Sequence, residues 1–276
     1  MEFIPGFLKG AKAAYDSRKM GGELWNALMI KLKGKKATIV FTGLPGAGKT
    51  QLFDRLSGKT EKEGYRPPGR STKVEKASKK ISKDELRDEP KKRLSYVVIP
   101  GQISSVRQKA FDELFAGKTE IAGVIHVVSS GLPTLRTREA MQVLKEQHIS
   151  DVASYRQYQL LQEVDDLDET CQAIERYMVA SRKPIWLFIV ATKIDLFLST
   201  LDQDLDAYEK ASGPFVERLR QLQTRVGSLN FDWELVAVSA WNDDFDYNGE
   251  KLISNIAPEQ QNEYLNAFLQ RMIDKC

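Results

Sequence analysis

An apolar segment that runs directly into a glycine-rich loop limits most strongly what this chain can fold into. From residue 38 to residue 50 it reads Thr-Ile-Val-Phe-Thr-Gly-Leu-Pro-Gly-Ala-Gly-Lys-Thr, a strand-like run that ends in the pattern G-x-x-x-x-G-K-T. Glycines suit a backbone that wraps around phosphate oxygens, because side chains would block the approach of its N–H groups. The amphipathic run from Gln51 to Leu56 then begins a helix, whose N-terminus favours anions. Strand, loop and helix in this order predict a phosphate-binding loop.

The side chains of this loop suggest how a nucleotide would be held. Lys49 would neutralise the β- and γ-phosphates, and the Thr50 hydroxyl would ligate Mg²⁺. The expected nucleotide contacts in this part of the chain are Gly43, Pro45, Gly46, Ala47, Gly48, Lys49, Thr50 and Gln51.

Strand-like and helix-like runs alternate along the rest of the chain. The apolar strand runs are 37–43, 94–99, 121–129, 184–192 and 233–239, with a weaker alternating run at 74–81. The helix-period segments are 106–115, 155–181, 208–226 and 259–273. This alternation predicts an α/β fold with a mostly parallel sheet covered on both faces. Together with the phosphate-binding loop, it leads us to expect a P-loop NTPase fold, a three-layer sandwich with about six strands. Ligands bind at the carboxyl ends of such strands, which is where the glycine-rich loop falls.

Composition narrows the class of protein. The net charge of the 276 residues is +3, too small to indicate a nucleic-acid partner. The two cysteines, Cys171 and Cys276, have no spacing typical of a zinc site or a disulfide framework, so a reducing compartment is expected. No apolar run approaches the roughly 18 residues that a membrane span needs. We therefore expect a cytoplasmic protein.

The chain divides into two expected regions. Residues 1–35 are expected to form an amphipathic helical extension, with basic residues off its apolar stripe. Such a helix lies in a membrane interface, or it folds onto its own domain or a partner, and both alternatives stay open here. Residues 36–276 are expected to form the nucleotide-binding domain, with a basic switch-like loop at 59–93 and a helical insert at 131–158.

Two further motifs bear on the choice of base. Thr192, Lys193 and Asp195 form the pattern T-K-x-D at the end of one strand run, and the last strand run ends in Ser239 and Ala240. With the glycine-rich loop, these motifs resemble those of the translation-factor-related GTPases, the class that contains Ras-like, Arf-like and signal-recognition-receptor β-like proteins. The resemblance implies GTP or GDP with Mg²⁺. It also implies that Asp195 accepts hydrogen bonds from the base, that the Lys193 stem covers it, and that the Ala240 N–H donates to its O6. A carboxylate fits guanine because guanine presents two adjacent donors.

A fourth motif departs from that family. Its members end one strand in D-x-x-G, where Asp holds a Mg²⁺-bound water and Gly senses the γ-phosphate. Here Gly101 aligns with that Gly and Val98 with the Asp, so the carboxylate is missing. Gln102 follows directly, where Ras-like and Arf-like enzymes keep the glutamine that orients the attacking water. An exposed glutamine at a helix start is the alternative interpretation. The resemblance covers about residues 36–275.

The family also binds Mg²⁺ through a threonine between the first helix and the second strand. We assign this role to Thr72, which directly precedes the expected strand, with Thr60 as the alternative. Arg66, Arg70 and Lys73 lie around Thr72 in the sequence. They indicate either an internal arginine finger or a basic, mobile loop.

Two other features are interpreted as structural. His126 lies in the middle of an apolar strand run, which indicates a core or edge histidine rather than a catalytic base. The acidic residues between 163 and 169 indicate a solvated helix face rather than a metal site.

Together the motifs indicate a guanine-nucleotide switch or regulatory GTPase that hydrolyses GTP. Gln102 and Lys49 are the expected catalytic residues, and Thr50 and Thr72 the expected metal ligands. The expected partners are a guanine nucleotide, a protein effector or regulator, and a membrane surface contacted by the N-terminal helix. No nucleic-acid partner is expected.

Two alternatives come from other classes. A scaffold that binds GTP or GDP with little or no hydrolysis is the first, and Val98 is the feature that favours it. A nucleotide kinase or an ATPase is the second, and Asp195 together with Ala240 argues against it.

Overall fold

The computed structural model describes residues 23–24, 38–61, 63–67, 69, 73–79, 94–102, 104–135 and 137–275. Thr72, Arg70 and nearly all of the expected N-terminal extension lie outside the described residues. Predictions that concern them are therefore not tested by the fold.

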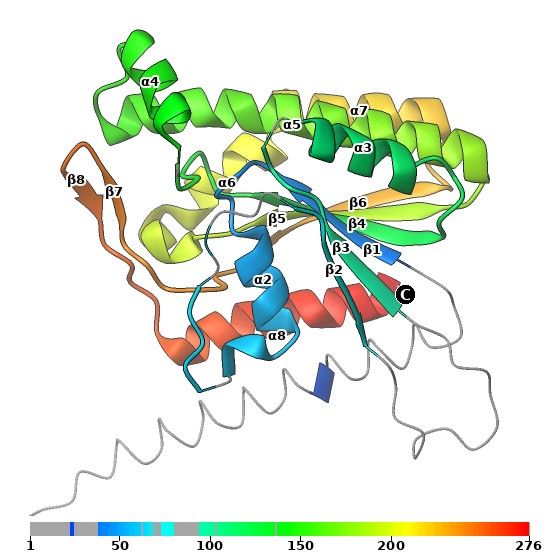
Figure 1. The fold of residues 1–276 in the computed structure, drawn as a ribbon, viewed down its shortest axis with the longest axis horizontal. Coiled ribbons are helices and arrows are strands. Elements are labelled where there is room, and N and C mark those ends of the chain that lie inside the picture. The colour runs from blue at the N-terminus through cyan, green and yellow to red at the C-terminus, as the bar shows by residue number, and fades with distance from the viewer. Residues whose placement is uncertain are drawn as a thin grey trace, which may run out of the picture.

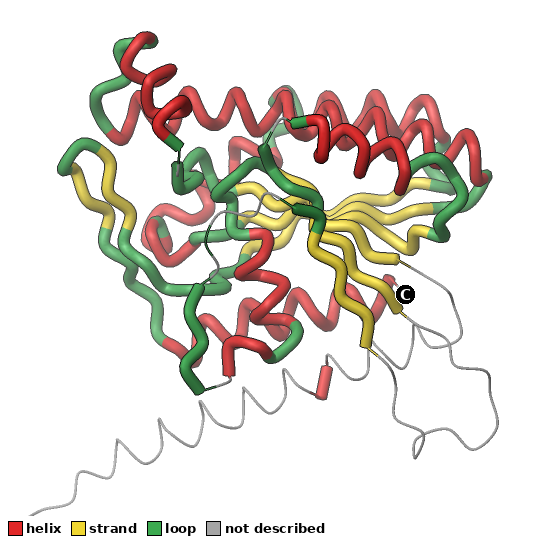
Figure 2. The backbone as a smooth tube through the Cα atoms, viewed as in Figure 1, coloured by secondary structure: helices red, strands yellow, loops and turns green. Residues whose placement is uncertain are grey.

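A six-stranded sheet forms the middle layer of the molecule (Figures 1 and 2). Its strands are β1 (Thr38–Gly43), β2 (Glu75–Lys79), β3 (Leu94–Val98), β4 (Ile121–Val128), β5 (Ile185–Ala191) and β6 (Phe231–Ala237). They are ordered β2-β3-β1-β4-β5-β6, and β2 alone runs antiparallel to its neighbour. Strands β1 and β5 are buried along their whole length, as expected for apolar strands covered on both faces. The predicted α/β architecture is confirmed.

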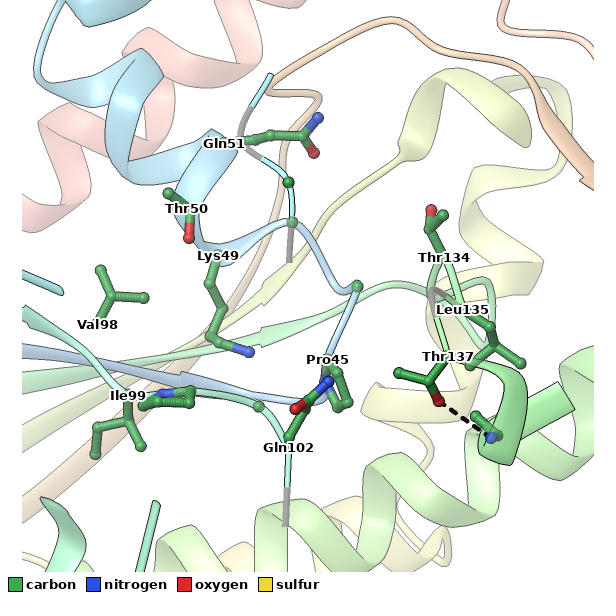
Figure 3. Close-up of a pocket in the computed structure, with 16 residues that line it drawn as sticks. Pro45, Lys49, Thr50, Gln51, Val98, Ile99, Gln102, Thr134, Leu135 and Thr137 are labelled. Atoms are coloured by element: carbon green, nitrogen blue, oxygen red, sulfur yellow. Dashed lines mark hydrogen bonds between the residues drawn. The ribbon is translucent and has the colours of Figure 1, made fainter. Parts of the chain in front are cut away.

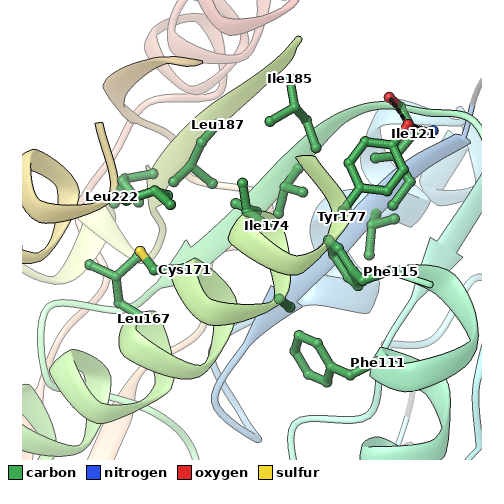
Figure 4. Packing of buried hydrophobic residues seen from close by; sticks show 14 of the residues in the cluster. Phe111, Phe115, Ile121, Leu167, Cys171, Ile174, Tyr177, Ile185, Leu187 and Leu222 are labelled. Atoms are coloured by element: carbon green, nitrogen blue, oxygen red, sulfur yellow. Dashed lines mark hydrogen bonds between the residues drawn. The ribbon is translucent and has the colours of Figure 1, made fainter. Parts of the chain in front are cut away.

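Helices cover both faces of the sheet (Figure 1). They are α2 (Lys49–Leu56), α3 (Ser105–Leu114), α4 (Arg138–Glu146), α5 (Val152–Ser181), α6 (Leu201–Glu209), α7 (Pro214–Val226) and α8 (Pro258–Lys275). Helices α2 and α8 share a core cluster with one face. Helices α3, α5 and α7 share a second cluster with the other face, where Phe111, Ile174 and Leu222 meet the sheet (Figure 4).

The predicted helix over 208–226 is wrong in its extent. Two helices, α6 and α7, occupy this region and are separated at residues 210–213. Pro214 is the first residue of α7 and Gly213 is its N-cap. Because proline lacks an N–H and clashes with the preceding turn, it starts a helix but does not continue one.

The hydrophobic pattern did not predict two features of the fold, the start of α5 and a hairpin. Helix α5 begins at Val152, ahead of the predicted residue 155, because the side chains of Asp151 and Ser154 form a capping box. A hairpin of β7 (Phe245–Tyr247) and β8 (Glu250–Leu252) was not predicted. Its turn contains Asn248 and Gly249 with φ of 53° and 87°, and this Asn-Gly pair was the available signal.

The carboxyl ends of the strands face α4 and the β7–β8 hairpin, at the left of Figure 1. Residues 131–158 contain α4 and the first turns of α5. At the other side of the molecule, Leu24 packs against the core cluster that includes α2 and α8. Within the described ranges, no helix combines the length and the apolar character needed to cross a membrane.

Candidate nucleotide-binding site

The glycine-rich loop (residues 43–50) joins β1 to α2 and has a backbone that requires glycine. Gly43, Gly46 and Gly48 have φ of 129°, 78° and 94°. A Cβ atom at Gly43 would lie 2.2 Å from the carbonyl oxygen of Val127, and one at Gly46 would lie 2.2 Å from that of Thr134. These positions therefore need glycine for both conformation and space.

Lys49 is buried within this loop. Its Nζ donates to the carbonyl oxygens of Gly43 at 2.6 Å and Leu44 at 2.8 Å. Burial lowers the pKa of Lys49 to about 7, although the Asp166 carboxylate acts in the opposite direction. A phosphate group beside Nζ would stabilise the charged form of the side chain.

A pocket opens beside the loop (Figure 3). Its walls come from the loop and the start of α2 and from residues 98–102 at the end of β3. They also include Thr134, Leu135 and Thr137 ahead of α4, and Ala140 in its first turn. Gly69 adds to the lining from the basic loop. Lys49, Thr50 and Gln102 thus border a single pocket, which also places the end of β3 next to the glycine-rich loop.

Gly101 is in close contact with the glycine-rich loop. A Cβ atom there would lie 2.2 Å from the backbone nitrogen of Pro45. Gln102 follows this contact and lies next to Pro45 in Figure 3. Gly101 and Gln102 therefore border the pocket beside the glycine-rich loop.

The base motifs come together at the ends of β5 and β6. The Ser239 hydroxyl donates to Asp195 Oδ1 at 2.9 Å, and the side chain of Asp195 is buried. Ala240, the next residue after Ser239, is also buried. Asp195 and Ser239 are far apart in sequence, and their contact joins the two motifs into one site.

Thr192 and Lys193 link the base motifs to the glycine-rich loop. The Thr192 hydroxyl donates to the carbonyl of Ala47 at 2.7 Å. Lys193 Nζ donates to the carbonyl of Leu132 at 2.7 Å and lies 2.8 Å from Thr134 Oγ1. Thr134 in turn donates its N–H to the carbonyl of Gly46 at 3.2 Å.

Sequence reasoning missed several residues of this region. Thr134 and Thr137 line the pocket from the segment before α4. Gln261 of α8 donates to Ser239 Oγ at 3.3 Å and to Asn242 Oδ1 at 2.7 Å. None of them belongs to a motif with characteristic spacing, so contact across the fold was the signal needed to find them.

The interpretation of the acidic cluster as a solvated face is wrong for two of its members. Glu163 and Asp166 are buried. Glu163 accepts bonds from the Ser129 N–H at 2.8 Å and the Tyr208 hydroxyl at 2.5 Å. Burial raises the pKa of both carboxyl groups. Helix α5 turns these two residues toward the sheet, since they share a face with its apolar side chains.

Asp166 belongs to a buried polar cluster under the loop. It pairs with Arg107 Nη2 at 2.5 Å, and Arg107 also donates to the carbonyl of Gly101 at 3.0 Å. His126 is fully buried, as predicted, and its Nδ1 lies 3.0 Å from the Thr42 hydroxyl. Burial, reinforced by the positive charges of Arg107 and Lys49, lowers the pKa of His126 to about 3. The ring is neutral at physiological pH.

A Mg²⁺ ion would fit this site only with help from phosphate and water. The part of the chain that the structure describes has no group of three or more His, Cys, Asp or Glu side chains able to hold a metal. Mg²⁺ prefers oxygen ligands and keeps several waters, with phosphates often completing its shell. The Thr50 hydroxyl in the pocket wall is a ligand of the right type.

The sheet order and the glycine-rich loop after β1 define an α/β fold of the P-loop NTPase type, with the two base motifs at the ends of β5 and β6. Comparison with protein-family models and with curated proteins gives no match.

Several solved structures are similar in fold. Toc33 from Arabidopsis thaliana in complex with GDP and Mg²⁺ is 10% identical over 95% of each chain, with a TM-score of 0.49. The signal recognition particle receptor SRb in its GTP/SRX complex from Chaetomium thermophilum is 17% identical, over 75% of this chain and 92% of that one, with a TM-score of 0.45. The small COPII coat GTPase SAR1 from Encephalitozoon cuniculi, in complex with GDP, is 16% identical, over 97% of this chain and 94% of that one, with a TM-score of 0.38.

Proposed function

We propose that the protein binds GTP and GDP with Mg²⁺ and acts as a guanine-nucleotide switch or regulatory GTPase. The observation that carries the proposal is the contact between Asp195 and Ser239, 2.9 Å apart. It holds a buried carboxylate just beyond the end of β5, which β4 separates from β1 and its glycine-rich loop. A second bond, from Thr192 to Ala47, holds this base site at a fixed distance from the glycine-rich loop.

The proposed chemistry uses positioning and charge. The backbone N–H groups of the loop and Lys49 bind the phosphates, and Thr50, with Thr72 as the second proposed ligand, holds the metal. Mg²⁺ would neutralise charge that develops on the phosphate oxygens. Gln102 orients the attacking water, since it follows the glycine that packs against the loop.

A guanine-nucleotide-binding scaffold is the second candidate. Val98 favours it, because an apolar side chain that is 2% exposed lines the pocket where the related enzymes keep a carboxylate. Both candidates predict nucleotide binding, and they differ in turnover.

Two measurements test the proposal. Calorimetry should show binding of GTP and GDP but not of ATP, and equal binding of ATP would overturn the guanine assignment. Single-turnover hydrolysis should then be slow and fall further in Gln102→Leu, which should bind GTP as the unmodified protein does. Absence of cleavage at every Mg²⁺ concentration, with cell extract added as a source of partner, would favour the scaffold.

We also propose a protein effector or regulator as a partner, and contact of the N-terminal extension with a membrane surface. The alternation of apolar and basic residues in residues 1–22 supports the second proposal.

A further inference from the structure

Position 98 holds Val instead of the Asp that the family pattern places there. The expected Mg²⁺ site therefore has one negatively charged side chain fewer. Val98 is the last residue of β3, and it lines the pocket together with Thr50. In the sheet, Val98 pairs directly with Glu75, the first residue of the antiparallel strand β2. Residues that pair directly across antiparallel strands project to the same face, with Cβ atoms about 4.5–5.5 Å apart.

Glu75 reaches the residue expected to bind the metal. The Thr50 hydroxyl donates to Glu75 Oε1 at 3.3 Å. The carboxylate also lies close enough to Lys49 to act on it electrostatically. Glu75 is half-buried at the edge of the sheet, so its charge is partly shielded from water.

We propose that Glu75 supplies the carboxylate of the Mg²⁺ site in place of the missing Asp at Val98. This inference rests on the proposed function. A hydroxyl that binds a cation uses an oxygen lone pair, so its hydrogen stays free to donate to a carboxylate. Glu75 accepts that hydrogen and thereby turns the Thr50 oxygen toward the metal, as partners of metal ligands do in other sites. Glu75 is a positioning residue.

Other buried or half-buried carboxylates near the loop have different partners. Asp54 is engaged by Lys59 at 2.7 Å and by the Tyr65 hydroxyl at 3.2 Å. Asp166 is paired with Arg107 on the opposite side of the sheet from α2. Glu75 contacts Thr50 and pairs with Val98 across the two strands. Neither relation could be predicted from the spacing of the sequence motifs.

The test measures how strongly Mg²⁺ slows the release of a fluorescent GDP analogue, using the full chain. We expect Glu75→Gln and Glu75→Ala to raise the Mg²⁺ concentration for half-maximal retention by about 10–100-fold, the usual cost of losing such a partner. Val98→Asp, introduced into Glu75→Ala, should return the value toward that of the unmodified protein, because it restores a carboxylate on the facing residue.

Glu63→Gln is the matched control. Glu63 is exposed, lies in the connection that leads from α2 to the strand of Glu75, and loses the same charge on substitution. It should leave the Mg²⁺ dependence unchanged. Thermal unfolding of each variant shows that an effect of Glu75→Gln comes from the site and not from loss of the fold.

Two outcomes overturn the inference while leaving the proposed binding of guanine nucleotide intact. One is a Glu75→Gln variant in which nucleotide release depends on Mg²⁺ as in the unmodified protein, although Thr50→Val abolishes this dependence. The other is nucleotide release that does not respond to Mg²⁺ at all in the unmodified protein. If the unmodified protein binds no guanine nucleotide, the proposed function itself fails.

Discussion

At the scale of single residues, the proposed base site is the buried carboxylate of Asp195, which hydrogen-bonded neighbours hold in place. Asp195 accepts from Ser239, and Gln261 of α8 donates to the same serine. A carboxylate held in this way presents acceptors only, which suits the two adjacent donors of guanine. In the proposed function, specificity for guanine depends on the Asp195 side chain and on Gln261 of α8, which contacts the serine that holds it.

Exchange of Asp195 for Asn should change the preferred base. In Asp195→Asn, calorimetry should show weaker binding of GTP and tighter binding of xanthosine triphosphate, because Asn donates to the carbonyl that replaces the guanine amino group. Asp202→Asn, on the exposed part of α6, serves as a control that should bind GTP normally. A variant with unchanged preference would remove Asp195 from the base site.

His126 should make the fold sensitive to acid. Its pKa is about 3 in the folded protein and 6.5 in its ordinary state, so the unfolded chain takes up the proton first as the pH falls. The contribution of neutral His126 to the free energy of unfolding is thus fully present above about pH 6.5. It is lost toward pH 3, by about 1.4 kcal/mol per pH unit. Between pH 7 and pH 5 the unmodified protein should lose about 2 kcal/mol more free energy of unfolding than His126→Gln.

Urea unfolding at the two pH values measures this difference. Asp166, whose Oδ2 lies 3.8 Å from His126 Nε2, and the nearby Arg107 and Lys49 are present in both proteins. Their own titrations therefore cancel to first order. Equal losses in the two proteins would show that the ring of His126 is not protonated on unfolding.

At the scale of elements, Arg107 ties the end of β3 to α5. The guanidinium is 2% exposed, donates to the carbonyl of Gly101, and pairs with Asp166 and Glu169 of α5. The segment that contains Gly101 and Gln102 is thus fixed from the face opposite α2. A displacement of this segment would therefore change the contacts of α5.

Removal of Arg107 should be costly. Arg107→Ala leaves the Asp166 carboxylate buried without its cation, and breaking such a pair typically costs about 3–5 kcal/mol of free energy of unfolding. Arg176→Ala, in which an exposed α5 side chain 4.0 Å from Asp112 is removed, should cost about 1 kcal/mol or less. Equal costs in denaturant unfolding would show that the buried pair does not stabilise the fold.

The elements also show which features a sequence reveals. Strand β1, the glycine-rich loop and α2 were predictable because local periodicity and backbone requirements coincide there. The burial of Glu163 and Asp166 was not, because their partners Ser129, Tyr208 and Arg107 come from other parts of the chain. Glu75 was missed for a related reason, since the register between β2 and β3 decides what it faces.

At the scale of the whole molecule, the carboxyl edge of the sheet carries the candidate site. Leu24 packs against the cluster formed with α2 and α8. Leu24 is therefore a point at which the extension contacts the core. The basic amphipathic pattern of residues 1–22 remains a prediction of membrane contact.

Two truncations should distinguish these roles. Deletion of residues 1–22 should leave nucleotide affinity and Tm nearly unchanged and abolish sedimentation with anionic liposomes, because the apolar stripe and its charges are removed together. Deletion of residues 1–34 should also lower Tm, since it removes the packing of Leu24.

A full-length variant distinguishes the contribution of charge to liposome binding from that of apolar area. In it, Gln replaces four basic residues, Lys9, Lys12, Arg18 and Lys19. Each basic residue near an anionic surface contributes about 1 kcal/mol of attraction, so this variant should sediment with neutral and anionic liposomes equally weakly. The unmodified protein could fail to sediment with anionic liposomes while deletion of residues 1–22 already lowers Tm. That result would show that residues 1–22 stabilise the fold and do not bind membranes.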